Sequence, residues 1–251
     1  RRISRVRKVM APKNGYEDWE ITQMLSNKLG YPMNYKHASE IMDEVAQLTP
    51  TFKGVSYEKL DKLGSIQWPC NDEHPEGTPT MHIDEFVRGK GKFFITEYVP
   101  TAEKVNSKFP LIMTTGRILA HYNVGAQTRR TKNTEWHDED LIEIHPHDAE
   151  ERGINERDWV GINSRSGDTV LRAKITNRVQ PGVVYTTFHH PVSGANVITT
   201  DNSDWATNCP EFKVTAVQVT KVTQPSNWQS KYQKFSEKQI DFVKNGEEKV
   251  N

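Results

Sequence analysis

The sequence predicts an α+β fold in which a compact β-barrel follows a smaller mixed region. Three observations lead to this prediction. From about Ser107 to Thr223, short apolar stretches alternate with turn residues; only one or two short helical stretches interrupt them; and the residues before Asn106 include apolar positions at helical spacing. Many short strands with few helices favour a barrel over a parallel α/β sheet. We therefore divide the chain into 1–106, 107–223 and 224–251.

The first region contains two predicted helices. In the stretch from Trp19 to Leu29 the apolar residues are spaced as one helical face, and Gly30 follows where a helix would end. The second runs from Ser39 to Gln47, with Ser39 as its N-cap. The apolar face of the first helix consists of Trp19, Ile21, Met24, Leu25 and Leu29.

From Thr49 to Thr80 the sequence is rich in Pro and Gly and predicts a long loop. Structureless loops of this length are uncommon in compact domains. We therefore expect the segment to be functional or packed on a neighbouring domain.

The barrel region contains six predicted strands. Ser166, Gly167 and Asp168 between the third and fourth strands predict a hairpin, and a short helix from Pro146 to Arg152 ends at Gly153. The lysine-rich tail carries a predicted surface helix from Trp228 to Val243. The strands are Phe109 to Thr115, Leu141 to Ile144, Trp159 to Asn163, Thr169 to Ile175, Val183 to Phe188 and Phe212 to Val219.

Composition excludes several classes of protein. The 251 residues include 33 Lys and Arg and 33 Asp and Glu, so no net charge attracts nucleic acid or anionic lipid. No apolar stretch reaches the roughly 20 residues that span a bilayer, and the start of the chain lacks the apolar core of a signal peptide. Two distant cysteines do not make a disulfide framework and suit a reducing compartment. We expect a soluble protein that is not secreted. Because the chain starts at Arg1 rather than Met, we expect a fragment of a longer polypeptide.

The basic run RRISRVRK at the start of the chain has two interpretations. It could bind nucleic acid, but it has no interleaved aromatic residues and belongs to no recognised nucleic-acid-binding motif. We favour a solvated edge of a domain.

The run TTGRILAHYNVGAQTRRT, from Thr114 to Thr131, is the most informative segment. It follows an apolar strand and combines two glycines with several Arg, Thr, His and Asn side chains. Glycine lets a backbone approach a ligand closely, while Arg and Thr donate hydrogen bonds to phosphate and heterocycles. The pattern predicts a bound organic cofactor.

This run, followed by DAEERGINERDWVGINSRSGDTVLRAKITNRVQPGVVYTTFHH and GANVITTDNSDWATNCPEFK, resembles the C-terminal domain of the molybdopterin-guanine-dinucleotide oxidoreductases. The GSIQWPC stretch from Gly64 to Cys70 and the HYNVGAQTRRT wording resemble the large (alpha) subunit of cytoplasmic formate dehydrogenases. The resemblance implies a six-stranded double-psi β-barrel preceded by the tail of an α/β domain, and a cytoplasmic location.

The implied cofactor is bis(molybdopterin guanine dinucleotide) carrying Mo or W, which this domain would clamp. The resemblance implies that Gly116 allows the cofactor to approach closely and that Arg117, His121 and Asn123 reach it. It also implies that Thr128 and Arg129 donate hydrogen bonds to its pyrophosphate or pterin. The implied cofactor-binding residues are Thr115, Gly116, Arg117, His121, Asn123, Thr128, Arg129, Phe188, His189, Asn196, Phe212 and Lys213.

Several of these residues also have a plainer interpretation. Gly116 and Arg117 alone would be a turn with a solvated charge, and Asn196 alone would form an Asx turn. His189 and His190 are adjacent on a strand and point to opposite faces, so a shared metal ion is disfavoured, and His190 is a contact or a packing residue. Phe212 stands where the family often has tyrosine. Arg130 is expected to be structural or exposed.

The sequence supplies no metal ligand and no catalytic residue. Cys70 is followed by Asn71 and Asp72, whereas the family's metal-binding cysteine or selenocysteine is followed by histidine, so we interpret Cys70 as a buried structural thiol. The iron–sulfur cysteines, the active-site histidine and the substrate arginine of the family have no counterpart here.

The implied partners are therefore the remainder of the catalytic subunit and iron–sulfur electron-transfer subunits, with NAD-reducing or hydrogenase subunits as further partners and formate and carbon dioxide as substrates. No nucleic acid or membrane span is implied. Two alternatives remain: the same domain of another molybdenum oxidoreductase such as nitrate reductase, and a non-catalytic scaffold without cofactor.

Overall fold

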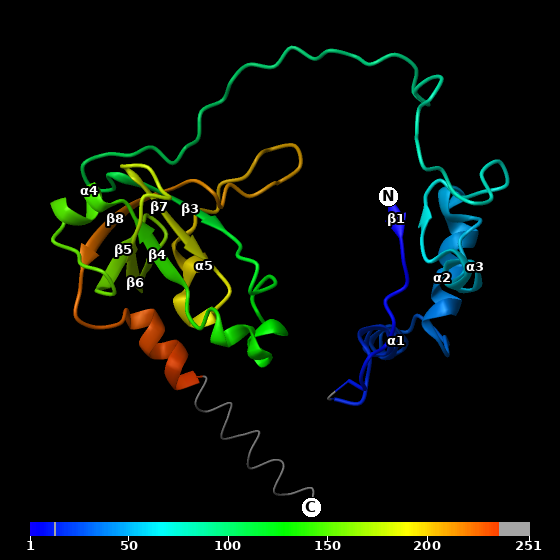
Figure 1. The fold of residues 1–251 in the computed structure, drawn as a ribbon, viewed down its shortest axis with the longest axis horizontal. Coiled ribbons are helices and arrows are strands. Elements are labelled where there is room, and N and C mark those ends of the chain that lie inside the picture. Colours follow the sequence, from blue (N-terminus) through cyan, green and yellow to red (C-terminus); the bar gives the residue numbers. More distant parts are fainter. Residues whose placement is uncertain (13, 236–251) are drawn as a thin grey trace, which may run out of the picture. The chain divides into compact units, whose positions relative to one another are not determined.

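The computed structural model describes residues 1–12 and 14–235, and the chain divides into two compact units, Arg1–Thr96 and Glu97–Asn251 (Figure 1). We call them the first unit and the barrel unit.

The barrel unit is built on a closed six-stranded barrel with the strand order β3-β7-β4-β6-β5-β8. The β3/β7 and β4/β6 pairs are parallel and the other neighbouring pairs are antiparallel. The barrel prediction is confirmed. The strands are β3 Leu111–Gly116, β4 Leu141–Ile144, β5 Trp159–Asn163, β6 Asp168–Ile175, β7 Val183–Thr187 and β8 Thr215–Lys221.

The barrel interior is filled by apolar side chains that alternate along the strands. In β3, Leu111 and Met113 are buried while Ile112 is half-buried, as a period of two requires. Closing the sheet also leaves no unpaired strand edge. The core comprises Leu111, Met113, Ile142, Ile144, Ala149, Ile154, Val160, Ile162, Leu171, Ala173, Val184, Ile198, Val217 and Val219.

Several strand ends differ from the prediction, and two of these differences concern predicted site residues. Strand β7 ends at Thr187, so Phe188 lies just beyond it. Strand β8 begins at Thr215, and Phe212 and Lys213 lie in a turn in which the Val214 amide donates to the Glu211 carbonyl at 3.2 Å. The predicted strand from Phe212 was therefore too long. Both side chains are exposed, so the apolar alternation that defines the strand starts only at Thr215.

Short helices connect the strands. α4, Pro146–Glu151, ends as predicted before Gly153, whose φ of +61° is the left-handed conformation that glycine adopts readily. α5, Ala195–Ile198, contains Asn196, so the Asx-turn interpretation is not observed there. Residues 227–235 are helical, and the rest of the predicted tail helix lies outside the described residues. The remaining short turns are η2 Thr128–Arg130, η3 Lys132–Glu135 and η4 Pro191–Ser193.

The first unit contains α1 Asp18–Lys28, α2 Ala38–Leu48, η1 Pro50–Phe52, α3 Tyr57–Leu63 and an antiparallel pair of short strands, β1 Arg2–Ile3 and β2 Ile66–Gln67. Both predicted helices form. The predicted N-cap of the second was wrong: His37 caps α2, because its Nδ1 accepts a hydrogen bond from the Ser39 amide.

The prediction of a long loop from Thr49 to Thr80 was also wrong in part. The segment contains η1, α3 and β2, and its side chains Val55, Leu60, Ile66 and Cys70 form the small core of the first unit. Ser56 caps α3 by accepting from the Lys59 amide at 3.1 Å. Local Pro and Gly content concealed these elements because burial, and not periodicity, stabilises them. Cys70 is fully buried, as predicted.

The basic run at the start of the chain is largely paired within the first unit. Arg1 donates to the carbonyls of Trp68, Thr78 and Pro79, Arg5 and Arg7 pair with Asp61, and Lys8 pairs with Glu17 at 2.7 Å. Hydrogen bonds and ion pairs therefore attach this segment to the rest of the first unit. In the part of the chain that the structure describes, no helix has the length and apolar character needed to cross a membrane.

Candidate cofactor site

The parallel pairing of β3 and β7 brings the two predicted cofactor segments together. Gly116 at the end of β3 is in register with Thr187 at the end of β7. Because parallel strands run in the same direction, the segments that leave them emerge at the same end of the barrel. The Arg117 guanidinium consequently lies over the Phe188 ring, 5.3 Å from its centroid. Sequence-distant residues that were predicted separately are therefore neighbours.

His189 clamps the segment that follows β3. It is fully buried; its Nε2 accepts a hydrogen bond from the Ile118 amide at 3.2 Å, and its Nδ1 donates to the Asn123 carbonyl. Both ring nitrogens are therefore used within the protein, which assigns the Nδ1–H tautomer. Asn123 has a φ of +48°, so its backbone turns sharply toward this clamp. His189 therefore holds the backbone of the predicted cofactor segment, and neither of its ring nitrogens is free.

His121 and Thr128 brace the same segment from within. His121 is buried, with Nδ1 3.0 Å from the Thr128 hydroxyl and Nε2 2.7 Å from the His137 carbonyl. The Thr128 hydroxyl also accepts from the Tyr122 amide at 3.3 Å. These bonds fix the conformation of the segment between the two residues.

The two glycines of the segment make room for protein rather than for open space. A Cβ at Gly116 would lie 2.7 Å from the Tyr185 ring, and one at Gly125 would lie 2.6 Å from the His189 carbonyl oxygen. Gly125 also has a φ of +72°, which a side chain would strain. Tyr185 packs closely against Gly116, and its hydroxyl donates to the Arg117 carbonyl at 3.3 Å.

Other predicted residues carry groups that could reach a ligand. Arg117 and Asn196 are exposed, and the Nε of Arg129 is buried without a hydrogen-bond partner among the described residues. Lys213 donates to the Thr115 carbonyl at 2.9 Å, and the Thr115 hydroxyl donates to the Phe212 carbonyl at 3.1 Å. Thr115 thus ties the turn before β8 to the end of β3.

Sequence reasoning missed Asp140, which lies behind the His189 clamp. Its carboxylate accepts hydrogen bonds from the Thr187 hydroxyl and from the amides of His189 at 3.2 Å and His190 at 2.8 Å. Burial would raise the pKa of Asp140, but the neighbouring His190 ring and the hydrogen bonds from the Thr187 hydroxyl and the His190 amide outweigh it and hold the pKa well below its usual range. The site therefore has a buried, ionised carboxylate. Asp140 ends an acidic stretch, Asp138 to Asp140, and nothing in that stretch marks which residue is buried.

The half-buried His137 and the buried His190 complete a cluster of imidazoles with the buried His121 and His189. The ring centroids of His121 and His190 are 5.1 Å apart, and those of His137 and His190 are 6.0 Å apart. Burial and the neighbouring imidazoles lower the pKa of His137, while Asp140 opposes the change. Nδ1 of His190 lies 3.2 Å from the Asp140 carboxylate but is not aligned for a hydrogen bond, and Nε2 of His137 and of His190 has no partner among the described residues.

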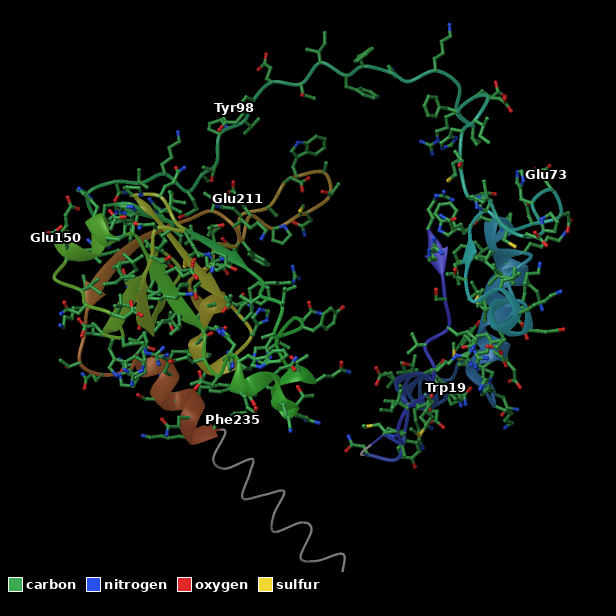
Figure 2. The ribbon with its side chains drawn as sticks, in the orientation of Figure 1. Trp19, Glu73, Tyr98, Glu150, Glu211 and Phe235 are labelled. Atoms are coloured by element: carbon green, nitrogen blue, oxygen red, sulfur yellow. The ribbon has the colours of Figure 1, made fainter. Side chains whose placement is uncertain are left out.

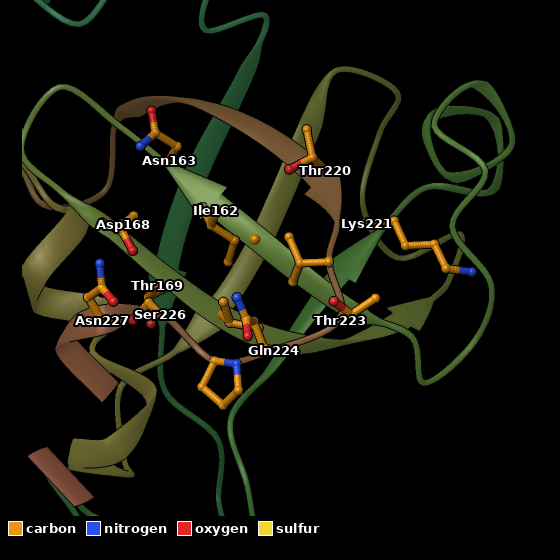
Figure 3. Close-up of a pocket in the computed structure, with 14 residues that line it drawn as sticks. Ile162, Asn163, Asp168, Thr169, Thr220, Lys221, Thr223, Gln224, Ser226 and Asn227 are labelled. Carbon is orange, nitrogen blue, oxygen red and sulfur yellow. The ribbon is translucent and has the colours of Figure 1, made fainter. Parts of the chain in front are cut away.

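The larger surface hollows lie away from the predicted residues. The one drawn in Figure 3, about 520 Å³, is lined by β5, β6 and the end of β8 and includes Asn163, Asp168, Thr169 and Lys221. It shares no residue with the predicted site. A second hollow of about 310 Å³ is bordered by Asp140, Trp159, Arg172 and His190, and it also shares no residue with the predicted site.

Among the described residues, His147, Asp148 and Glu151 are close enough to share a metal ion. They lie on the six-residue α4, and Asp148 already accepts from the Gly182 amide at 2.8 Å. The hydrogen bond from Gly182 gives Asp148 a structural role, and we do not assign a metal site to these three residues.

The fold and this site define a class of protein. Residues 111–216 match the family described as the Molydopterin dinucleotide binding domain, and the barrel belongs to that family. The chain is also similar to whole enzymes of a more particular kind.

Two curated relatives show this. The chain is 40% identical over 228 residues to the F420-dependent formate dehydrogenase subunit alpha of Methanocaldococcus jannaschii, an alignment that covers 88% of this chain and 34% of that protein. It is 33% identical over 208 residues to formate dehydrogenase H of Escherichia coli, covering 80% of this chain and 29% of that protein. The chain thus spans about a third of the length of these relatives.

Among solved structures, acetylene hydratase from Pelobacter acetylenicus matches with a TM-score of 0.60 at 14% identity, covering 83% of this chain and 33% of that one. At that identity the similarity shows a shared fold.

Proposed function

We propose that this chain is the C-terminal, cofactor-binding part of the catalytic subunit of a formate dehydrogenase, and that its barrel clamps bis(molybdopterin guanine dinucleotide) with Mo or W. The observation that carries the proposal is the meeting of the ends of β3 and β7, which places Arg117, Phe188 and the clamped segment 117–131 together. The similarity to formate dehydrogenase alpha subunits supports formate as the substrate over nitrate.

The residues present fit such a group. Arg117, Arg129 and Lys213 supply cationic donors for a pyrophosphate, and the partnerless Nε of Arg129 is a buried donor that a bound anion would satisfy. Phe188 and the exposed Phe212 offer apolar faces beside those cations. A barrel that served only as a scaffold would have no physical reason to keep a buried guanidinium nitrogen unpaired.

When bound, the pterin-chelated metal supplies the two-electron chemistry that interconverts formate and carbon dioxide. This chain's residues would bind and orient the group. Arg117, Arg129 and Lys213 would neutralise its phosphates, Asn196 would hydrogen-bond it, and Thr115, His121, Asn123, Thr128 and His189 would hold the backbone that presents these side chains.

The remainder of the catalytic subunit would supply the metal ligand, the iron–sulfur cysteines and the substrate residues. We further propose iron–sulfur electron-transfer subunits as partners, with an acceptor-reducing subunit beyond them, and a cytoplasmic location. The free thiols of Cys70 and Cys209, both among the described residues, support a reducing compartment.

The test is Arg117→Ala in the assembled enzyme, with Arg130→Ala as the control from the same segment. We expect Arg117→Ala to lower pterin and metal content per chain, measured by fluorescence of the oxidised pterin and by elemental mass spectrometry, while Tm changes little. Arg130 is exposed, and its variant should keep the wild-type content. Full cofactor content in Arg117→Ala would overturn the assignment of the site, and a wild-type enzyme without guanine dinucleotide would favour the scaffold alternative.

A further inference from the structure

Asp140 is linked to the predicted cofactor segment through a short series of contacts. Its carboxylate fixes three of the four positions 187–190 where the chain leaves β7, by accepting from the Thr187 hydroxyl and the His189 and His190 amides. These bonds set the direction of the chain as it leaves the barrel.

His189 transmits this constraint to the other segment. With its backbone fixed by Asp140, its buried ring is placed between the Ile118 amide and the Asn123 carbonyl. These two residues bound the stretch that directly follows Arg117, and the Arg117 guanidinium lies 3.5 Å from the Asn123 amide oxygen. Asp140 is therefore linked to the Arg117 side chain through His189 and Asn123, and it makes no contact with Arg117 itself.

The contacts of Asp140 are of a kind that confers geometry. A buried carboxylate that accepts several hydrogen bonds must keep all of them, because each loss leaves a charge or an amide unsatisfied in a medium of low dielectric. Both of its oxygens are used: Oδ1 accepts from Thr187 and from the His189 amide, and Oδ2 accepts from the His190 amide. An asparagine would place an NH₂ group against at least one of these donors.

We propose that Asp140 is the positioning residue of the cofactor site: it fixes the end of β7 so that His189 holds the segment 117–123 in its ligand-binding conformation. The inference rests on the proposed function and extends it to a residue that no resemblance assigns. Asp140 acts on the site through His189 and would touch neither cofactor nor substrate.

The chain offers a matched control at the other end of the same strand. Asp148 is also buried, and its carboxylate accepts from the Gly182 amide at 2.8 Å, immediately before β7 begins. Asp140 thus holds the end of β7 and Asp148 its beginning. The same Asp→Asn change at each position removes a buried carboxylate that holds one end of β7, but only the Asp140 carboxylate bonds to His189.

The experiment compares Asp140→Asn and Asp148→Asn in the assembled enzyme by limited trypsin digestion and by pterin content per chain. Trypsin can cut the segment 117–123 after Arg117, whereas Arg129 and Arg130 lie beyond it. Cleavage after Lys90 and Lys92, which are exposed, provides an internal reference for protease activity. Relative to that reference, we expect cleavage in the segment to be about tenfold faster in Asp140→Asn, since losing charge-assisted bonds favours local opening. Asp148→Asn should cleave there at the wild-type rate.

Pterin content should fall in Asp140→Asn and remain near wild type in Asp148→Asn when the two are compared at equal distance below their own Tm. Asp140→Glu, which keeps the charge, should retain much of the pterin content. If Asp140 only filled space, the longer glutamate side chain would not have this effect. Equal cleavage and equal pterin content in the two Asn variants would overturn the proposal.

If Asp140→Asn does not fold, the Thr187→Val variant replaces it. It removes one donor to the Asp140 carboxylate and leaves the charge in place, and it should accelerate cleavage in the segment by a smaller factor. Wild-type cleavage in Thr187→Val would then count against the proposal. The proposed function fails separately, if the wild-type enzyme itself holds no pterin dinucleotide.

Discussion

The two units of this chain use their apolar residues differently. In the barrel unit, fourteen buried apolar side chains form one core inside a closed sheet, whereas the core of the first unit contains four. In α1, whose residues are all described, no side chain is buried, and Leu25 is 60% exposed. The barrel unit buries most of its apolar strand residues in its own core, whereas the first unit leaves the apolar face of α1 uncovered. A helix can therefore form at the predicted place without the packing that its pattern implies.

Separate expression of the two units gives the largest expected difference. Residues 97–251 should melt in one cooperative transition, because the closed barrel buries a complete core and leaves no strand edge. Residues 1–96 should show helix by circular dichroism but a broad, non-cooperative melt, because small cores rarely offset the lost chain entropy. A cooperative transition in 1–96 would contradict the comparison.

Matched truncations test the same contrast at single residues. Ile144→Ala in the barrel core should lower the free energy of unfolding by about 3 kcal/mol, since it leaves a cavity where a fully buried side chain stood. Leu25→Ala in α1 should change it by less than about 0.5 kcal/mol, because that side chain is mostly in water. Denaturant unfolding of the full chain measures both, and a large effect at Leu25 would show that α1 is buried in solution.

Gly116 provides a sharper test of packing in the barrel unit. Gly116→Ala should cost about 2 kcal/mol, because the new Cβ would lie 2.7 Å from the Tyr185 ring. In the Tyr185→Val background the same change should cost far less, since the obstructing ring is gone. A thermodynamic cycle of the four proteins measures the coupling. Gly116→Ala with wild-type stability but reduced cofactor content would support the predicted role of this glycine as a ligand contact.

The smallest expected effect concerns pH and His137. The pKa of His137 is lowered from 6.5 in the folded state, so the unfolded chain binds the proton more readily. Its contribution to stability is therefore fully present above about pH 6.5 and is lost as the pH falls toward the lower, folded pKa. The stability of His137→Gln should fall less than that of wild type between about pH 7 and pH 5. Parallel curves for the two proteins would show that His137 does not contribute.

Much of the barrel was predictable because its strands are short apolar stretches bounded by turn residues. β4 and β5 have their predicted bounds, and the hairpin between β5 and β6 turns where Gly167 indicated. The predictions were wrong where local pattern and burial disagree. Thr49 to Thr80 looked like a loop because of its Pro and Gly content, yet Val55, Leu60 and Ile66 form a core there. Non-local packing decides such segments, and a local pattern does not contain it.

The sequence by itself determined the elements of the barrel, the resemblance to the molybdopterin dinucleotide family and the segment around Arg117 as the candidate cofactor site. Only the tertiary structure decided that β3 and β7 are parallel neighbours, which brings Arg117 to Phe188. It also decided that His189 is a clamp and that Asp140 lies behind it. The physical reason is that hydrogen bonds between residues about 50 positions apart depend on strand pairing, which residue types at those positions do not encode locally.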